Sequence, residues 1–181
     1  MISWRSFPPS RVGAGPLRSW LVEAGSLTAR CQAACGRFRV RLVACGRGAA
    51  LRDEAFTPGG LQGRSWVREV VLECDGVPVI FAHTVLADRP RGRLTRWLVG
   101  LGSRSLGSLL FAYPGFARGG LEFLRVDRRH PLHGRASPYA PGADCFWARR
   151  SLHRLGGQQV LVTEVFLPAV ADLGRAKRPS A

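Results

Sequence analysis

The strongest local signal in this sequence is a two-residue turn, Asp75-Gly76, between two runs of β-forming residues. The first run extends from Ser65 to Cys74 and the second from Val77 to Leu86, with Pro78 making the start of the return strand irregular. An Asp-Gly pair between such runs is a strong hairpin signal because both turn positions need a positive φ. Strands joined by a tight turn must be antiparallel, so this pair constrains the kind of sheet that the chain can form.

A second hairpin is predicted near the end of the chain. Its strands span Cys145 to Leu155 and Gln158 to Leu167, and Gly156-Gly157 joins them. A further strand is predicted over 37–43, where apolar residues alternate with arginines and place Phe38, Val40 and Leu42 on one face. Hairpins therefore dominate, and strand–helix–strand alternation is absent from the pattern.

Helical spacing occurs in two places. Residues 16–24 and 27–34 predict two short helices, with Ser26 as the N-cap of the second. Residues 89–111 predict two more, separated by a break at 102–104. Residues 125–144 are rich in Pro, Gly and Arg and are interpreted as a long irregular loop. The expected class is α+β, a single mainly antiparallel sheet with helices on one face.

The length of 181 residues and a hydrophobic content of 46% fit one globular domain. We expect this domain to cover 16–170, with an irregular arm at 1–15 and a basic tail at 171–181. The sequence contains neither an apolar run of membrane-spanning length nor a signal-peptide pattern at Met1. We therefore expect a cytoplasmic protein without membrane insertion, and a monomer.

The formal net charge of +15 raises the alternatives of nucleic-acid binding or an anionic substrate. The positive charge is almost all arginine and is spread along the chain, and no DNA-recognition motif accompanies it, so no specific nucleic-acid partner is expected. Five cysteines in a chain without an export signal are expected to be free thiols. Cys31 and Cys35 could share a helix face, but further zinc ligands at suitable spacing are lacking, so no metal is expected.

One charged residue stands out in the strand that precedes Asp75. The period of two places Arg68 on the same face as Trp66, Val70 and Leu72, which is the apolar face. A guanidinium turned into a core costs several kcal/mol unless it is paired. Arg68 therefore needs a partner, either in the protein or in a ligand.

The last strand contains a similar anomaly. Residues 159–167 are apolar on both faces except for one carboxylate, Glu164. The residues alone favour a structural ion pair between Arg68 and Glu164. The alternative is that both side chains face a common cavity and bind a ligand.

Two helix starts could complete such a cavity, because N–H groups at a helix start lack partners and suit a carboxylate. Leu27 follows Ser26 at one of them, and Leu106 follows Ser105 at the other.

These residues lie in blocks that resemble the chorismate lyase family. The resemblance covers about residues 16–170, in the family's order and spacing. The most specific blocks are Trp66–Val70 with Asp75–Pro78, Ser105–Phe111, and Trp147–Ser151 with Leu161–Pro168.

The resemblance implies a six-stranded antiparallel sheet with an internal site that two helix–turn–helix flaps cover. It implies an enzyme that splits chorismate into 4-hydroxybenzoate and pyruvate for ubiquinone biosynthesis, without a cofactor. It also implies that Arg68 and backbone N–H groups near Leu106 and Leu27 hold the ring carboxylate, and that Glu164 meets the ring hydroxyl. Our hypothesis is that Glu164 orients this hydroxyl and assists the elimination.

One position departs from the family pattern. His83 stands where relatives usually have an arginine of the outer site, so it is a candidate for an altered outer site. In the loop at 125–144, Asp127, His130 and His133 raise a metal site as an alternative to a solvated loop. A ligand-sensing module of the same fold is the competing functional hypothesis, since effector domains of some transcription regulators resemble this fold.

Overall fold

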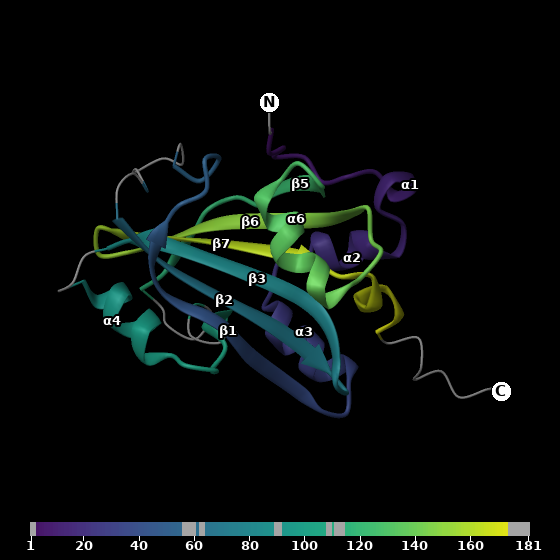
Figure 1. The fold of residues 1–181 in the computed structure, drawn as a ribbon, viewed down its shortest axis with the longest axis horizontal. Helices are drawn as coiled ribbons and strands as arrows, with labels where there is room; N and C mark the ends of the chain where they lie inside the picture. The colour runs from purple at the N-terminus through teal and green to yellow at the C-terminus, as the bar shows by residue number, and fades with distance from the viewer. Residues whose placement is uncertain are drawn as a thin grey trace.

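A computed structural model describes residues 3–55, 61, 64–88, 92–107, 110 and 115–173. In this part of the chain, seven strands form one antiparallel sheet in the order β1-β2-β3-β7-β6-β4, and β5 also pairs with β6 (Figure 1). The strands are β1 (Phe38–Ala49), β2 (Arg64–Cys74), β3 (Val77–Ala87), β4 (Ala117–Arg118), β5 (Glu122–Asp127), β6 (Cys145–Leu155) and β7 (Gln158–Phe166). The α+β class and the antiparallel sheet are confirmed.

Both predicted hairpins are present. Asp75 and Gly76 have φ angles of 52° and 83°, and Gly156 and Gly157 have 51° and 75°, so each turn uses the positive φ that its residues permit. The expected irregularity near Pro78 is also present, because the β2–β3 register shifts between Leu72 and Glu73.

Strand β1 is longer than predicted and forms one end of the sheet path. Phe38 and Val40 pack against the core, as the alternation predicts, but Leu42 is 41% exposed. The register with β2 shifts directly after Leu42, between Leu42 and Ala44. The simple alternation therefore ends at this bulge.

Helices cover one face of the sheet at two ends. At one end are η1 (Gly15–Leu17), α2 (Arg18–Leu21) and α3 (Leu27–Ala34), and at the other is α4 (Arg93–Gly100). Ser26 caps α3 as predicted, since its side chain accepts a hydrogen bond from the Ala29 N–H. Of the last predicted helix, Leu106, Gly107 and Leu110 are helical, while 108–109 lie outside the described residues.

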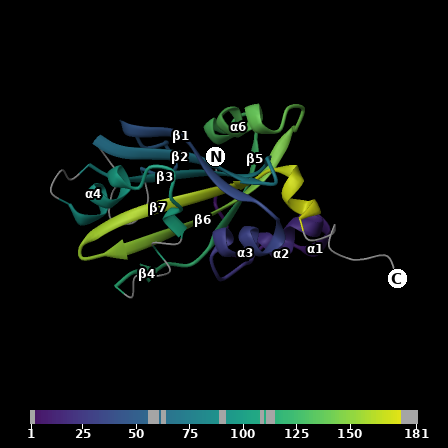
Figure 2. The same cartoon turned by 90° about the horizontal axis from the view of Figure 1, so that it is seen from below.

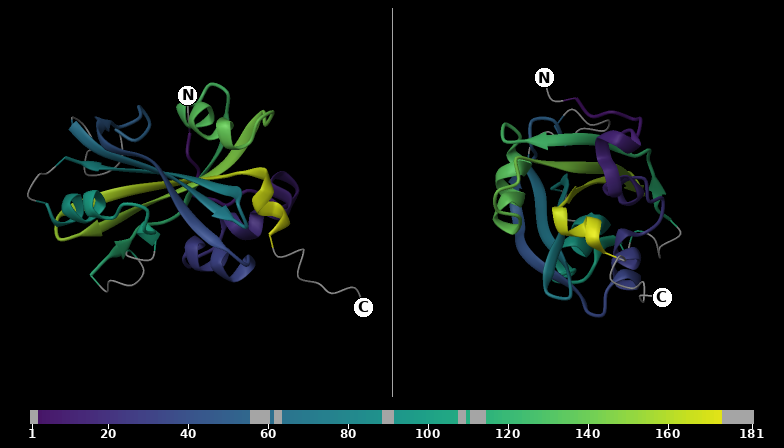
Figure 3. Two further views of the ribbon diagram at one scale, coloured as in Figure 1. Left: turned by 60° about the horizontal axis from the view of Figure 1, so that its bottom comes forward. Right: turned by 90° about the vertical axis from the view of Figure 1, so that its right-hand side faces the viewer.

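The opposite face is also covered, which corrects the expectation of helices on one face. Figures 2 and 3 show α6 (Pro131–Ala136) on the other side of the sheet from α2 and α3. Its Leu132 and Ala136 belong to a buried cluster with Val71 and Phe81.

The interpretation of 125–144 as an irregular loop is wrong. This segment contains the end of β5, all of α6 and the turn η2 (Ser137–Tyr139). Pro131 occupies the start of α6, where its missing N–H costs nothing, and the His130 ring accepts a hydrogen bond from the Leu132 N–H as the cap.

Residues 3–15 are more ordered than an irregular arm, because Arg5 forms a bridge with Phe123 and 11–14 form the short helix α1 (Arg11–Ala14). After β7, the turn η3 (Pro168–Asp172) ends the described part, so most of the expected tail lies outside it. The five cysteines are free thiols, as predicted. In the described ranges, helices of membrane-spanning length and apolarity are absent.

Candidate active site

Three rows of paired residues cross the sheet on the face that α3 and α4 cover. The middle row runs through Arg68, Thr84, Val162 and Ser151. The row on the α3 side runs through Val70, Ala82, Glu164 and Arg149. The row on the α4 side runs through Trp66, Leu86, Val160, His153 and Arg118. Because rows two residues apart share a face, the charged residues of all three rows point to the same side.

The two groups of helices leave a cavity between them over these rows. On one side α3 contributes Leu27 to a buried cluster with Val70 and Leu72. On the other side Leu94 and Leu98 of α4 pack with Leu86 and Val160. The empty space over these rows, including the solvent at its opening, amounts to about 580 Å³. Its polar lining comprises Thr28, Arg68, Thr84, Ser105, Arg118, Arg149, Ser151, His153 and Glu164.

Arg68 lies at the β2 side of the cavity and is 1% exposed. One terminal nitrogen, Nη2, donates to the carbonyl oxygens of Gly102 and Arg104 at 2.9 and 2.7 Å, in the turn after α4. Its Nε–H is buried without a hydrogen-bond partner in the described part of the chain. Burial lowers the pKa of Arg68 from its ordinary value, so an anion in the cavity would be a favourable partner.

Glu164 is paired with Arg149, and this corrects the ion pair that the residues alone favoured. The Arg149 Nε donates to Glu164 Oε2 at 2.7 Å, across the β6–β7 ladder. Arg149 also donates to the carbonyl oxygens of Leu21 and Glu23. Glu164 and Arg68 instead line the same cavity from β7 and β2.

The two predicted helix starts meet at the cavity. Leu27 and Leu106 both line it, although their sequence positions are far apart. The hydroxyl oxygens of Thr28 and Ser105 lie 2.6 Å apart and hydrogen-bond across the two helix starts. The structure thus brings Arg68, Glu164, Leu27 and Leu106 together around one cavity.

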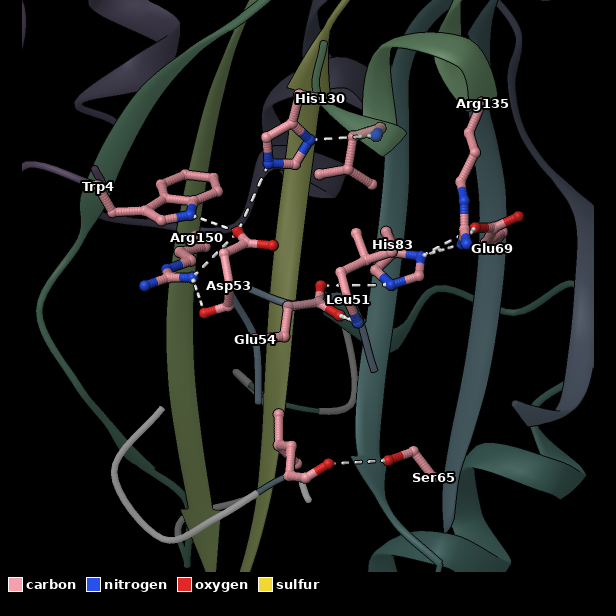
Figure 4. A network of polar contacts seen from close by, with 12 residues as sticks. Trp4, Leu51, Asp53, Glu54, Ser65, Glu69, His83, His130, Arg135 and Arg150 are labelled. Atoms are coloured by element: carbon pink, nitrogen blue, oxygen red, sulfur yellow. Dashed lines mark hydrogen bonds and ion pairs between the residues drawn. The ribbon is translucent and has the colours of Figure 1, made fainter. Parts of the chain in front are cut away.

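His83 lies elsewhere. It neighbours Glu69 and Thr163 in a row on the opposite face, and its ring is fully buried. Figure 4 shows the ring between two carboxylates, with Nε2 3.3 Å from Glu54 and Nδ1 2.9 Å from Glu69, and Glu69 also pairs with Arg135. Burial by itself lowers the pKa of His83, but the hydrogen bonds to Glu54 and Glu69 outweigh it and raise the pKa.

A second group of polar contacts lies beside this one (Figure 4). Asp53 accepts a hydrogen bond from the Trp4 indole at 2.7 Å and lies within 3.6 Å of both His130 and Arg150. Together the two groups attach residues 53–54 to the sheet and to α6. Groups of His, Cys, Asp or Glu able to hold a metal ion are absent from the described residues, and His130 and His133 instead make the protein contacts of α6.

Sequence reasoning missed three cavity residues on β6: Arg149, Ser151 and His153. The period of two in 145–155 places these three residues on one face of the strand. A polar face on a strand inside the sheet was the sequence signal that could have indicated that they line the cavity. Arg118 was also missed, because β4 is only two residues long and gives no pattern.

Solved structures of other proteins share the fold. The fold resembles the effector domain of PhnF from Mycobacterium smegmatis, with a TM-score of 0.53 and 18% identity over 81% of this chain and 91% of that one. A GntR-family transcriptional regulator from Bacillus cereus gives a TM-score of 0.52 and 12% identity over 74% of this chain and 93% of that chain. At such identities the likeness concerns the fold alone.

Sequence relatives are much more similar. A probable chorismate pyruvate-lyase of Dechloromonas aromatica is 70% identical over 87% of this chain and 89% of its own length. One of Ralstonia nicotianae is 44% identical over 93% and 90%. The family model for chorismate lyase matches residues 6–175, and the chain therefore belongs to the chorismate lyase family.

Proposed function

We propose that this protein is a chorismate pyruvate-lyase that forms 4-hydroxybenzoate for ubiquinone biosynthesis and binds the substrate ring between Arg68 and Glu164. The observation that carries the proposal is the single cavity into which both residues project, from strands that are not neighbours. Family membership supplies the reaction, and the cavity supplies the groups that suit its substrate.

Arg68 is the anchor for the ring carboxylate. Its Nη2 is held by two carbonyl oxygens, which fixes the guanidinium, while its Nε–H has no partner among the described residues. A carboxylate bound there would gain charge-assisted hydrogen bonds in a site shielded from water. The helix starts at Leu27 and Leu106 line the same cavity and would add backbone N–H donors.

Glu164 acts at the hydroxyl end of the ring. Its Oε2 accepts a hydrogen bond from Arg149, and a carboxyl oxygen can also accept a hydrogen bond from the 4-hydroxyl. In the reaction the bond between C3 and the ether oxygen breaks, C4 loses its proton, and the released enolpyruvate takes up a proton to become pyruvate. Aromatisation drives this elimination, so the protein chiefly needs to orient the ring and stabilise the moving charge.

The test is to mix the purified protein with chorismate and follow 4-hydroxybenzoate by absorbance. Wild type is expected to form product, and Arg68→Ala should lower kcat/KM by on the order of 100-fold, the loss expected for charge-assisted hydrogen bonds. Arg39→Ala, at an exposed arginine of β1, is the matched control and should keep wild-type activity. A folded wild type that leaves chorismate unchanged contradicts the proposal.

Turnover of chorismate, together with measurements of ligand and DNA binding, separates the competing functions. A ligand-sensing module of this fold would bind 4-hydroxybenzoate without turning over chorismate. A nucleic-acid-binding protein would bind DNA in a salt-dependent way and would not respond to Arg68→Ala.

The proposal extends to the state of the protein in the cell: a cytoplasmic monomer, with residues 16–170 as the catalytic domain and without a cofactor. Size-exclusion chromatography with light scattering tests the monomer, and a dimer would contradict it. Activity of protein treated with a chelator tests the absence of a metal requirement.

A further inference from the structure

The positive charge of the chain, +15 in total, is concentrated at one place on the surface. Five exposed arginines lie around α4 and the adjoining ends of β1 and β2: Arg47, Arg64, Arg93, Arg96 and Arg104. We call these five residues the α4 patch. They are far apart in the sequence, so only the fold brings them together. Figure 1 shows α4 at the end of the sheet that lies away from η3.

Contacts through a tryptophan join the β1 and β2 arginines to the helix. Arg47 pairs with Trp66 in the β1–β2 ladder, and its guanidinium lies 6.0 Å from the centre of the Trp66 ring. Arg64 is two residues before Trp66 and therefore has the same face of β2. Trp66 packs against the buried cluster that contains Leu94 and Leu98 of α4. Arg47 and Arg64 are thus neighbours of the helix.

The other three arginines belong to α4 and to the turn after it. The Arg93 guanidinium lies over the Trp97 ring, 4.5 Å from its centre. Arg96 follows Arg93 by three residues, which places both on one side of the helix. Arg104 donates to the Gly100 carbonyl oxygen at the end of α4.

One acidic residue belongs to this surface. Asp88 follows β3, and its carboxylate lies 3.0 Å from the Arg47 Nε. All twelve acidic residues of the chain are in the described part. The other eleven lie on the opposite face, beside Arg149, around α6, or toward α3 and η3. Five arginines and one aspartate give a formal charge of +4, and hydrogen bonds to neutral groups do not remove it.

The same surface exposes apolar side chains. Leu94 and Leu98 form the buried side of α4, whereas Val99 is 46% exposed. Trp97 is half-buried at the boundary between the two sides. The helix is therefore amphipathic, and its outer side combines arginine with apolar and aromatic residues. This combination is typical of helices that lie on a membrane surface.

We propose that the α4 patch is a docking surface for an anionic lipid bilayer, to which the protein binds peripherally and without inserting a helix. Such a bilayer offers negative head groups over a wide area, whereas a small anion engages only one or two of five arginines. Its interface also accepts Val99 and Trp97, and the phosphate backbone of a nucleic acid offers no apolar region to Val99. This inference does not depend on the reaction catalysed in the cavity.

The experiment measures how the full-length protein partitions onto sedimented vesicles, made of phosphatidylcholine alone or mixed with phosphatidylglycerol. Arg93→Gln/Arg96→Gln removes two charges from α4. The matched control, Arg37→Gln/Arg39→Gln, removes two exposed charges at the other end of β1. Val99→Ser removes the apolar contact. Thermal unfolding of each variant establishes that it is folded.

Wild type is expected to bind the vesicles that contain phosphatidylglycerol and not those of phosphatidylcholine alone, and high salt should weaken the binding. Each arginine near an anionic surface contributes about 5-fold to partition, so Arg93→Gln/Arg96→Gln should bind about 25-fold more weakly. The Arg37→Gln/Arg39→Gln control should stay close to wild type, and Val99→Ser should bind less than wild type.

Three results overturn the proposal. The first is a folded wild type that does not bind vesicles containing phosphatidylglycerol. The second is an equal loss in both double variants, which reveals a general effect of net charge. The third is tighter binding to duplex DNA than to these vesicles, weakened by Arg93→Gln/Arg96→Gln, which assigns the α4 patch to nucleic acid.

Discussion

Arg149 and Glu164 face each other across the β6–β7 ladder, with Arg149 Nε 2.7 Å from Glu164 Oε2. Arg149 is 1% exposed, and one of its terminal nitrogens, Nη1, donates to the carbonyl oxygens of Leu21, at the end of α2, and of Glu23, in the turn before α3. This one side chain therefore fixes the carboxylate of the cavity and attaches the connection between α2 and α3 to the sheet.

Arg149→Met should destabilise the protein strongly. It leaves the Glu164 charge in the cavity without its partner and frees the carbonyl oxygens of Leu21 and Glu23, so a loss of about 3 kcal/mol in the free energy of unfolding is expected. Urea unfolding measures it. Arg149→Met should also weaken the binding of 4-hydroxybenzoate, because Glu164 loses the side chain that fixes it. Arg150→Met removes the neighbouring arginine, which contacts the opposite face, and should retain this affinity. Equal loss of affinity in both variants would contradict the role given to Arg149.

Glu164→Gln should preserve the fold but slow the reaction. The amide keeps the size of the side chain and can still accept from Arg149, but it lacks the charge that orients the 4-hydroxyl, so kcat should fall by about 10-fold or more. Steady-state kinetics and the Kd of 4-hydroxybenzoate check this. Full turnover together with unchanged product affinity would show that Glu164 takes no part in either step.

His83 should make stability depend on pH. Because Glu54 and Glu69 raise its pKa above the unfolded value of about 6.5, protonated His83 stabilises the fold fully below pH 6.5. That contribution is lost as the pH rises through the folded pKa. The difference in unfolding free energy between wild type and His83→Gln should therefore be largest at about pH 6 and shrink toward alkaline pH; a difference that is constant with pH would refute this linkage.

The hydrogen bond between the hydroxyls of Thr28 and Ser105 joins the two helix starts that line the cavity, and it should keep them together. Thr28→Val keeps the shape of the side chain but removes the hydrogen bond to Ser105, which lies 2.6 Å away. We expect a loss of about 1 kcal/mol in stability and faster dissociation of 4-hydroxybenzoate in stopped-flow measurements. Thr163→Val, at a buried threonine on the opposite face, is the control for the loss of a hydroxyl and should leave the dissociation rate unchanged.

Much of the fold follows from the turns. Asp75-Gly76 and Gly156-Gly157 define four strands, and the period of two places Arg68 on the buried face. The pairing of Glu164 with Arg149 can also be predicted from the sequence. A two-residue turn at 156–157 pairs 155 with 158, and counting back along both strands pairs Arg149 with Glu164.

Other features depend on contacts that the sequence does not specify. The bulge between Leu72 and Glu73 shifts the β2–β3 register by one residue, so counting from Asp75-Gly76 gives the wrong neighbour for Glu69. Helix α6 is stabilised by packing of Leu132 and Ala136 on the sheet and not by its own Pro- and Gly-containing sequence. Thr84 pairs with Arg68 and lies on the cavity face of the sheet. Because side chains alternate along a strand, the adjacent His83 lies on the opposite face.

We propose that Arg68 and Glu164 hold the two ends of one ring. The most direct measurement is a crystal structure of the protein with 4-hydroxybenzoate. We predict the carboxylate of the ligand within hydrogen-bond distance of the Arg68 guanidinium and its hydroxyl at Glu164. A ligand bound outside this cavity, or bound with its carboxylate at Arg118 and its hydroxyl at Arg68, would contradict these roles of Arg68 and Glu164.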